Sequence, residues 1–327
     1  FTYASDEQLT FFPEAFKKAE TELVDHNVSI ISDGDPHELK DIDPKRLFMA
    51  SDSRKKVREW YDEKERQGKF SWTLAMYPTA AMAAEAGMSL QEYWQQVIEG
   101  CYLDKPDPVA EWKRIQAELD RLKGALNALK IERVHVEAEG IDLWVKLGAN
   151  RQWLGGSGRN IPSYELFISP DWRGTEGVVR FNQPLYRFGN LVKDVALEFK
   201  GGRVVKASAS QGEDFLKAMI ARENADKIGE FSLTDRRISR ITRFMADTLF
   251  DENMGGPFGN THLAVGKAYK DSFDGDQSKP SKEEWEAMGF NESPEHTDIV
   301  STTDRTVTAE LPGGGTTVIF KDGQFTL

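Results

Sequence analysis

One segment in the last third of the chain combines residue types that could do chemistry. Residues 251–269 read DENMGGPFGNTHLAVGKAY and contain two acids, a glycine-rich bend, His262 and, seven residues later, Tyr269. A glycine-rich bend can bind phosphate through backbone N–H groups, but a P-loop also needs a lysine directly after the glycines. No lysine stands there, and the segment WLGGSGRNIP at 153–162 fails the same test. Sharp turns therefore explain these glycines better than phosphate binding does.

A metal site is the other use for an acid and an imidazole, and a second segment supports it. The sequence HTD places His296 and Asp298 two residues apart, so on a strand both side chains point to the same face. The remaining candidates are acids beside apolar residues: Glu165 in YELFI, Glu230 in IGEFSLTD and Glu252 in FDEN. Each acid taken alone is more simply an exposed or salt-bridged side chain. Spacing therefore supplies candidate ligands and leaves their convergence open.

Composition restricts the chemistry and the partners. The 327 residues carry 42 basic and 54 acidic side chains, a formal net charge of −12, which gives nucleic-acid binding no electrostatic support. The single cysteine, Cys101, cannot form an intrachain disulfide or a CxxC metal site. Any metal must therefore bind through nitrogen and oxygen. No apolar run approaches the roughly 20 residues that span a membrane, so we expect a cytoplasmic protein.

The elements that must position these residues change character along the chain. In the first hundred residues, apolar segments predict strands at 27–32, 46–51 and 69–78, and 53–68 predicts a helix ended by Gly68. Ser89 and Glu92 have the spacing of a capping box. Asp107 followed by Pro108 predicts the start of a long helix that joins two domains, with apolar residues at spacings of three and four.

After residue 130 the pattern alternates between apolar and polar residues. It predicts antiparallel hairpins at 132–148, 191–210 and 306–327, the first turning at Glu139-Gly140 and the second at Gly201-Gly202. The segment HLAVGKAY predicts a helix, which would place His262 and Tyr269 two turns apart on one face. The polar stretch 274–284 predicts a surface loop. His26, His37 and His135 are interpreted as structural or exposed.

Four segments together resemble the M29 family of thermophilic metallo-aminopeptidases: NIPSYELFISPDWRGTEG, IGEFSLTD, TLFDENMGGPFGNTHLAVGKAY and HTDIV. They occur in the family's order, and the resemblance runs from about residue 72 to the end. It implies an α/β protein of two domains. Residues 1–106 would form an N-terminal α/β domain that is incomplete at its start, and residues 107–327 a mixed α+β catalytic domain rich in antiparallel hairpins. The family resemblance also implies a homodimer.

The resemblance further implies a centre with two divalent metal ions. Its ligands would be Glu165, Glu230, Glu252, His262, His296 and Asp298. The link from Glu252 to His262 is longer here than in many family members, which makes Glu252 the least secure ligand. Nitrogen and oxygen ligands without thiolate suit Zn²⁺, Co²⁺ or Mn²⁺. Tyr269 would lie beside the metals.

The expected activity is release of the N-terminal amino acid from peptides with a free amino group. The metals would activate a water and polarise the carbonyl, and Tyr269 would donate a hydrogen bond to the developing oxyanion. Glu165 would transfer the proton, with Glu230 as the other candidate. Two alternatives stay open: a catalytically inactive metal-binding scaffold, and a metal-dependent amidohydrolase acting on small non-peptide amides.

Overall fold

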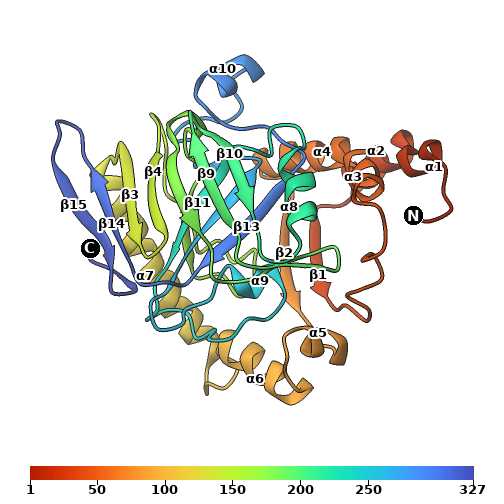
Figure 1. Cartoon of the computed structure of the whole chain (residues 1–327), viewed down its shortest axis with the longest axis horizontal. Helices are drawn as coiled ribbons and strands as arrows, with labels where there is room; N and C mark the ends of the chain where they lie inside the picture. Colours follow the sequence, from red (N-terminus) through yellow and green to blue (C-terminus); the bar gives the residue numbers. More distant parts are fainter.

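Two antiparallel sheets organise most of the computed structural model, which describes residues 1–327 (Figure 1). The larger sheet has eight strands in the order β10-β9-β6-β4-β3-β14-β15-β16. Their bounds are β3 (Arg133–Ala138), β4 (Ile141–Lys146), β6 (Glu176–Arg180), β9 (Ala196–Lys200), β10 (Arg203–Ser208), β14 (Arg305–Glu310), β15 (Thr316–Lys321) and β16 (Gln324–Phe325). The three predicted hairpins are confirmed, because β3 pairs with β4, β9 pairs with β10, and β14 pairs with β15, which in turn pairs with β16.

The smaller sheet has four antiparallel strands in the order β13-β12-β11-β5. Their bounds are β5 (Glu165–Ile168), β11 (Ile228–Thr234), β12 (Asn260–Gly266) and β13 (His296–Ser301). Every residue of the two central strands, β11 and β12, is buried. Alternate residues of the four strands belong to the hydrophobic core, among them Leu166 of β5, Phe231 of β11 and Leu263 of β12. The opposite face carries the polar residues described below.

The N-terminal part contains a parallel strand pair and most of the short helices. Its elements are α1 (Asp6–Thr10), α2 (Glu14–Leu23), β1 (His26–Ile31), α3 (Pro44–Asp52), α4 (Lys55–Arg66), β2 (Ser71–Met76), α5 (Ala80–Glu85) and α6 (Leu90–Gly100). Strands β1 and β2 confirm the predictions at 27–32 and 69–78, and they pair in parallel. Helix α4 and the capping box of α6 are also as predicted.

The predicted strand at 46–51 is wrong, because these residues belong to helix α3. The side chain of Asp43 accepts a hydrogen bond from the Lys45 N–H, and Pro44 occupies the first helical turn. An acid followed by proline is a helix-start signal, as it is at the later Asp107. Leu47 and Phe48 are the buried residues of α3. The short apolar run obscured a start signal that was present in the sequence.

Helix α7 (Pro108–Leu129) begins at the predicted cap, where the Asp107 side chain accepts from the Ala110 N–H. Its buried residues are Ile115, Leu119, Leu122 and Leu126, at the predicted spacings. They belong to one hydrophobic core of 51 residues that also includes residues of both sheets and of α5 and α6. The division at residue 106 stays a prediction. No helix is both long enough and apolar enough to cross a membrane.

The predicted helix at 262–269 is also wrong, because His262 lies in the central strand β12 and Tyr269 follows that strand. Pairing with β11 on one side and β13 on the other decides this conformation, since tertiary context overrides weak helix propensity. The remaining elements are η1 (Trp172–Gly174), β7 (Leu185–Arg187), β8 (Asn190–Val192), α8 (Glu213–Ile220), α9 (Thr248–Asp251), η2 (Lys270–Ser272) and α10 (Lys282–Ala287). The predicted surface loop at 274–284 is correct up to residue 281 and wrong at 282–284, which form the first turn of α10.

Candidate metal centre

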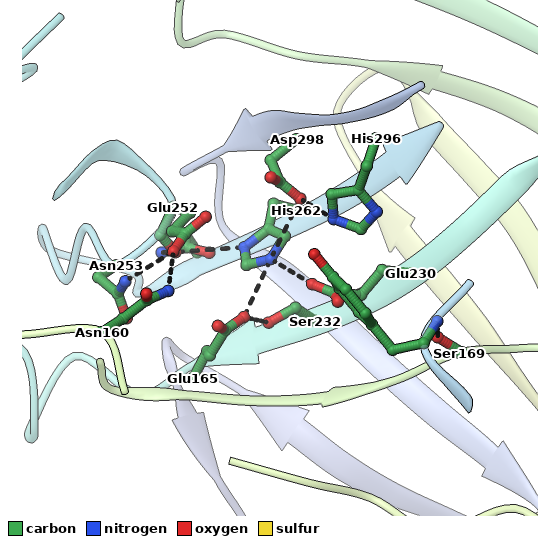
Figure 2. A network of polar contacts seen from close by, with 12 residues as sticks. Asn160, Glu165, Ser169, Glu230, Ser232, Glu252, Asn253, His262, His296 and Asp298 are labelled. Carbon is green, nitrogen blue, oxygen red and sulfur yellow. Dashed lines mark hydrogen bonds and ion pairs between the residues drawn. The ribbon is translucent and has the colours of Figure 1, made fainter. Parts of the chain in front are cut away.

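Five of the six candidate ligands project from one face of the four-stranded sheet (Figure 2). Paired residues of neighbouring strands share a face, and so do residues two apart in one strand. The register pairs Thr234 with Glu165, Ser232 with His262, Ala264 with Asp298, and Gly266 with His296. Glu230 lies two residues before Ser232 and therefore joins this face. Each of the four strands thus contributes at least one ligand, and the prediction that His296 and Asp298 share a face is confirmed.

The fully buried imidazole of His262 lies at the centre of this face. Its Nε2 atom is 3.0 Å from Glu165 Oε2, 3.1 Å from Glu230 Oε1 and 3.9 Å from Asp298 Oδ1. Its Nδ1 atom is 3.2 Å from the main-chain carbonyl oxygen of Glu252. Because a carbonyl can only accept, Nδ1 carries a proton and donates it, which leaves Nε2 of the neutral ring free to bind a cation.

His296 is oriented in the same way. Its Nδ1 atom donates to the Lys267 carbonyl oxygen at 2.8 Å, and its Nε2 atom is 3.6 Å from Asp298 Oδ1. Two groups of donor atoms result, and within each group the atoms lie within 4.8 Å of one another. The first consists of Glu165, Glu230 and His262, and the second of Glu230, His296 and Asp298. Glu230 belongs to both groups.

The charges of this cluster fit a bound cation. No lysine or arginine pairs with Glu165, Glu230, Glu252 or Asp298. The ion-pair partners of Glu165, Glu230 and Asp298 are the two histidines. Burial raises the pKa of Glu230 to about 7. The Oδ1 atom of Asp298 is buried without a hydrogen-bond partner. Carboxylates removed from water are costly unless a positive charge compensates them, so divalent ions fit this donor set.

His262 responds to the same acids. Burial alone would lower the pKa of its imidazole, but the hydrogen bond to Glu165 and the nearby Glu230 and Asp298 raise that pKa well above its usual value. Without a metal, the cluster therefore holds extra protons in place of a cation. A divalent ion bound to Nε2 would compete with those protons.

Glu252 lies next to this cluster but in neither donor group. It follows helix α9, and its side chain is buried. Its Oε1 atom accepts long hydrogen bonds of 3.4 Å from the side-chain amides of Asn160 and Asn253. Burial, followed by the charges of Glu165 and Asp298, raises the pKa of its carboxyl well above the usual value. The structure thus brings Glu252 to the site and leaves its role as a ligand a prediction.

Tyr269 lies at the edge of the site. Its ring centroid is 4.6 Å from that of His296, and its main-chain N–H donates to Ser169 Oγ at 2.8 Å. Loss of solvent around the phenol raises its pKa well above 10, and the charges of Glu230 and Asp298 act in the same direction. The phenol therefore keeps its proton at neutral pH and can donate a hydrogen bond.

Sequence reasoning missed the residues that hold the candidate ligands in place. Ser232 Oγ donates to Glu165 Oε2 at 2.8 Å, and strand alternation from Glu230 would have indicated that Ser232 shares its face. Asn160 beside Glu252 had no comparable signal, because it arrives from a loop. Nothing in the residue types predicts that the carbonyl of Lys267 orients His296.

The site opens into a groove of about 1120 Å³. One wall is the ligand-bearing face, and the other comes from the N-terminal part, chiefly α4. Two ion pairs reach α4 from other parts of the lining: Lys267, after β12, pairs with Asp62 at 2.7 Å, and Arg159, from the segment 153–162, pairs with Glu65 at 2.5 Å. The groove gives a ligand larger than water access to the cluster.

This fold and site define a protein with a candidate metal centre, which is built from carboxylates and imidazoles on one face of an antiparallel sheet. Comparison with protein families matches residues 1–325 to the thermophilic metalloproteases of family M29. The chain belongs to this family, as its four segments predicted.

Curated relatives match most of this chain and are themselves longer. The chain is 30% identical to aminopeptidase AmpS of Bacillus subtilis (strain 168) over an alignment of 335 residues that covers 96% of this chain and 80% of the relative. It is 32% identical to aminopeptidase T of Thermus aquaticus over an alignment of 286 residues that covers 82% of this chain and 68% of the relative. Among solved structures, wild-type AmpT from Thermus thermophilus superposes with a TM-score of 0.82 at 23% identity, covering 100% of this chain and 83% of that one. That likeness establishes the shared fold.

Proposed function

We propose that this protein is a metal-dependent aminopeptidase that releases N-terminal amino acids from peptides with a free amino group. The observation that carries the proposal is the pair of donor groups that share Glu230 at the base of the groove. Membership in a family whose curated relatives bear the name aminopeptidase supports the reaction type. Peptides are the proposed substrates, and nucleic acid is not a partner because the chain is acidic.

The proposed cofactors are two divalent ions, Zn²⁺, Co²⁺ or Mn²⁺. Glu165, Glu230 and His262 would hold one ion, and Glu230, His296 and Asp298 the other. Glu252, which follows α9, would be an additional ligand. When bound, such ions supply a water that is activated near neutral pH and polarise the scissile carbonyl. The nitrogen and oxygen donors suit all three metals.

The chain's own groups then orient the substrate and move protons. The phenolic hydroxyl of Tyr269 donates a hydrogen bond to the carbonyl oxygen that gains negative charge. Glu165 accepts the proton from the attacking water and delivers it to the leaving amine. We assign this role to Glu165 because Glu230 is shared by both donor groups, and because Ser232 fixes one oxygen of Glu165.

We further propose a homodimer in the cytoplasm. The resemblance to the M29 family supports the dimer. The single cysteine, Cys101, is a buried free thiol, which suits a reducing compartment.

A direct test compares the hydrolysis of leucine p-nitroanilide, which has a free amine, with that of its N-acetylated form. We expect the protein loaded with Zn²⁺, Co²⁺ or Mn²⁺ to hydrolyse the free-amine substrate, and N-acetylation of the substrate to abolish turnover. A chelator should remove the activity, and added metal should restore it. Equal turnover of the acetylated substrate would favour an amidohydrolase. A folded, metal-loaded protein without any turnover would favour a binding scaffold.

A further inference from the structure

Phe167 presents an aromatic ring to the groove from the ligand-bearing face. It lies two residues after Glu165 on β5 and pairs with Ser232 of β11, so its side chain shares the face of the candidate ligands. Two residues along a strand span about 7 Å, which sets the spacing between the two side-chain positions. Phe167 is only partly buried and lines the groove, whereas its neighbours Leu166 and Ile168 belong to the core.

A second aromatic ring extends this apolar surface. Tyr269 packs edge-to-face against Phe167, with ring centroids 6.2 Å apart, and keeps 38% of its surface exposed. Most other groove-lining side chains are charged or polar. The remaining aromatic residues of the lining, Tyr61, Phe70 and Trp72, come from the opposite wall. Phe167 and Tyr269 thus form the aromatic surface that adjoins the metal centre.

The backbone beside Phe167 pairs with the glycine-rich segment 153–162. Leu154 and Phe167 exchange two main-chain hydrogen bonds, of 2.8 and 2.9 Å. The next residue, Gly155, has φ +144°, and a Cβ atom there would lie 2.2 Å from the Glu165 carbonyl oxygen. Only glycine fits this approach. The segment that failed the phosphate test therefore has a structural role: it holds the strand that carries both Glu165 and Phe167.

We propose that Phe167, with the ring of Tyr269, forms the subsite for the side chain of the substrate's first residue, and that it selects bulky apolar side chains. This inference rests on the proposed aminopeptidase function. The side chain of the first residue begins two bonds from the scissile carbonyl carbon. If that carbonyl is held at the candidate ligands, the side chain therefore lies next to the adjacent position of the same face, which is Phe167. A leucine or phenylalanine side chain would cover the exposed ring of Phe167 and remove apolar surface from water.

The test compares Phe167→Ala with the wild type, both metal-loaded, on p-nitroanilides of leucine, phenylalanine and alanine. We expect kcat/KM for the leucine and phenylalanine substrates to fall roughly 10- to 100-fold, the range that apolar pocket contacts provide. The alanine substrate should change less than about threefold, and metal content should be unchanged. Phe167→Leu should keep the leucine preference. Phe70→Ala, which removes an aromatic ring from the opposite wall, is the matched control and should leave the ratios unchanged.

Equal losses on all three substrates, or unchanged ratios in Phe167→Ala, would overturn the subsite while leaving the aminopeptidase function in place. A binding measurement separates the two proposals if the wild type hydrolyses none of the amides. Leucinol and alaninol carry the free amine and side chain but no scissile carbonyl. Calorimetric titration should show that the wild type binds leucinol more tightly than alaninol. The variant Phe167→Ala should bind the two compounds with equal affinity. Equal affinities of the wild type for both would contradict the subsite.

Discussion

Two histidines of this protein each lie between two carboxylates, and only one of them belongs to the candidate metal centre. His135 on β3 of the large sheet has Nε2 at 2.7 Å from Asp142 and Nδ1 at 3.5 Å from Glu137. His262 on β12 has Nε2 within 3.1 Å of Glu165 and Glu230. The side chains of Asp142 and Glu137 are 74% and 59% exposed, whereas those of Glu165 and Glu230 are 9% and 5% exposed.

Burial is what separates these two clusters. Water compensates the charges around His135, so that ion pair contributes little, and the imidazole also stacks on Trp144 with centroids 4.0 Å apart. Around His262 water is largely excluded, and the acids need a cation or protons. Both nitrogens of His135 face carboxylates, whereas a carbonyl fixes the tautomer of His262. The same residue types therefore make a surface ion pair in one sheet and a ligand set in the other.

The sharpest test replaces each histidine by alanine. His262→Ala should lose bound metal and reduce leucine p-nitroanilide hydrolysis by roughly 10³-fold or more, because a catalytic metal contributes several kcal/mol to the transition state. His135→Ala should retain both metal content and activity. Elemental analysis and steady-state kinetics check both variants. Full metal loading in His262→Ala would remove this residue from the ligand set.

His296→Ala tests whether the cluster holds two ions or one. We expect it to lose at least one metal per chain and nearly all activity while the fold survives, because His296 belongs only to the second donor group. Glu230→Gln should lose both ions, since Glu230 is shared by the two groups. Metal-to-protein ratios measured alongside circular dichroism give the answer. Loss of only one ion in Glu230→Gln would contradict two sites that share one carboxylate.

Tyr269→Phe separates hydrogen-bond donation from metal binding. The variant keeps the ring beside His296 and loses only the phenolic hydroxyl. We expect kcat to fall roughly 10²–10³-fold, the usual effect of removing one oxyanion donor, with metal content intact. Steady-state kinetics and elemental analysis on one preparation suffice. An unchanged kcat would exclude Tyr269 from the mechanism.

Chelation should make stability depend on pH. In the metal-free fold the pKa of Glu230 is about 7, against an ordinary value of 4.5. Between these values the folded chain binds more protons than the unfolded chain, so its free energy of unfolding decreases as the pH rises. The raised pKa values of Glu252 and His262 act in the same direction. We expect a loss of roughly 3 kcal/mol from about pH 5 to about pH 7.

Urea unfolding of chelated and metal-loaded protein measures this loss. The metal-loaded protein is the control, because bound cations compensate the carboxylates and should largely remove the dependence. Rising stability of the chelated protein over the same pH range would mean that the acids are not protonated together in the fold.

The smallest effect is expected at the surface cluster. Asp142→Asn removes one carboxylate partner of His135 and should change the free energy of unfolding by less than about 1 kcal/mol. Its effect should shrink further at high ionic strength, because salt screens exposed charges. Thermal unfolding at low and high salt checks both points. A loss of several kcal/mol would show that the His135 cluster is not the surface ion pair described above.

Several features of the site could be predicted from the sequence because they depend on neighbours along the chain. Alternation on a strand aligned His296 with Asp298, and glycine turns marked the hairpins. The predictions at 46–51 and 262–269 failed for two different reasons. In the first case the local start signal of Asp43 with Pro44 decides for a helix against the short apolar run. In the second, strands β11 and β13 decide the conformation from positions far away in the chain.

The sequence by itself determined the donor types, the absence of a thiolate site, the hairpins and, through four ordered segments, the family. Only the tertiary structure decided that Glu165, Glu230, His262 and Asp298 converge, that Glu252 lies beside them in neither donor group, and that His135 stays at the surface. Convergence depends on strand order and register across residues far apart in the chain, and those follow from packing of the whole core. Burial decides the chemistry of a carboxylate, and it is a property of the folded molecule.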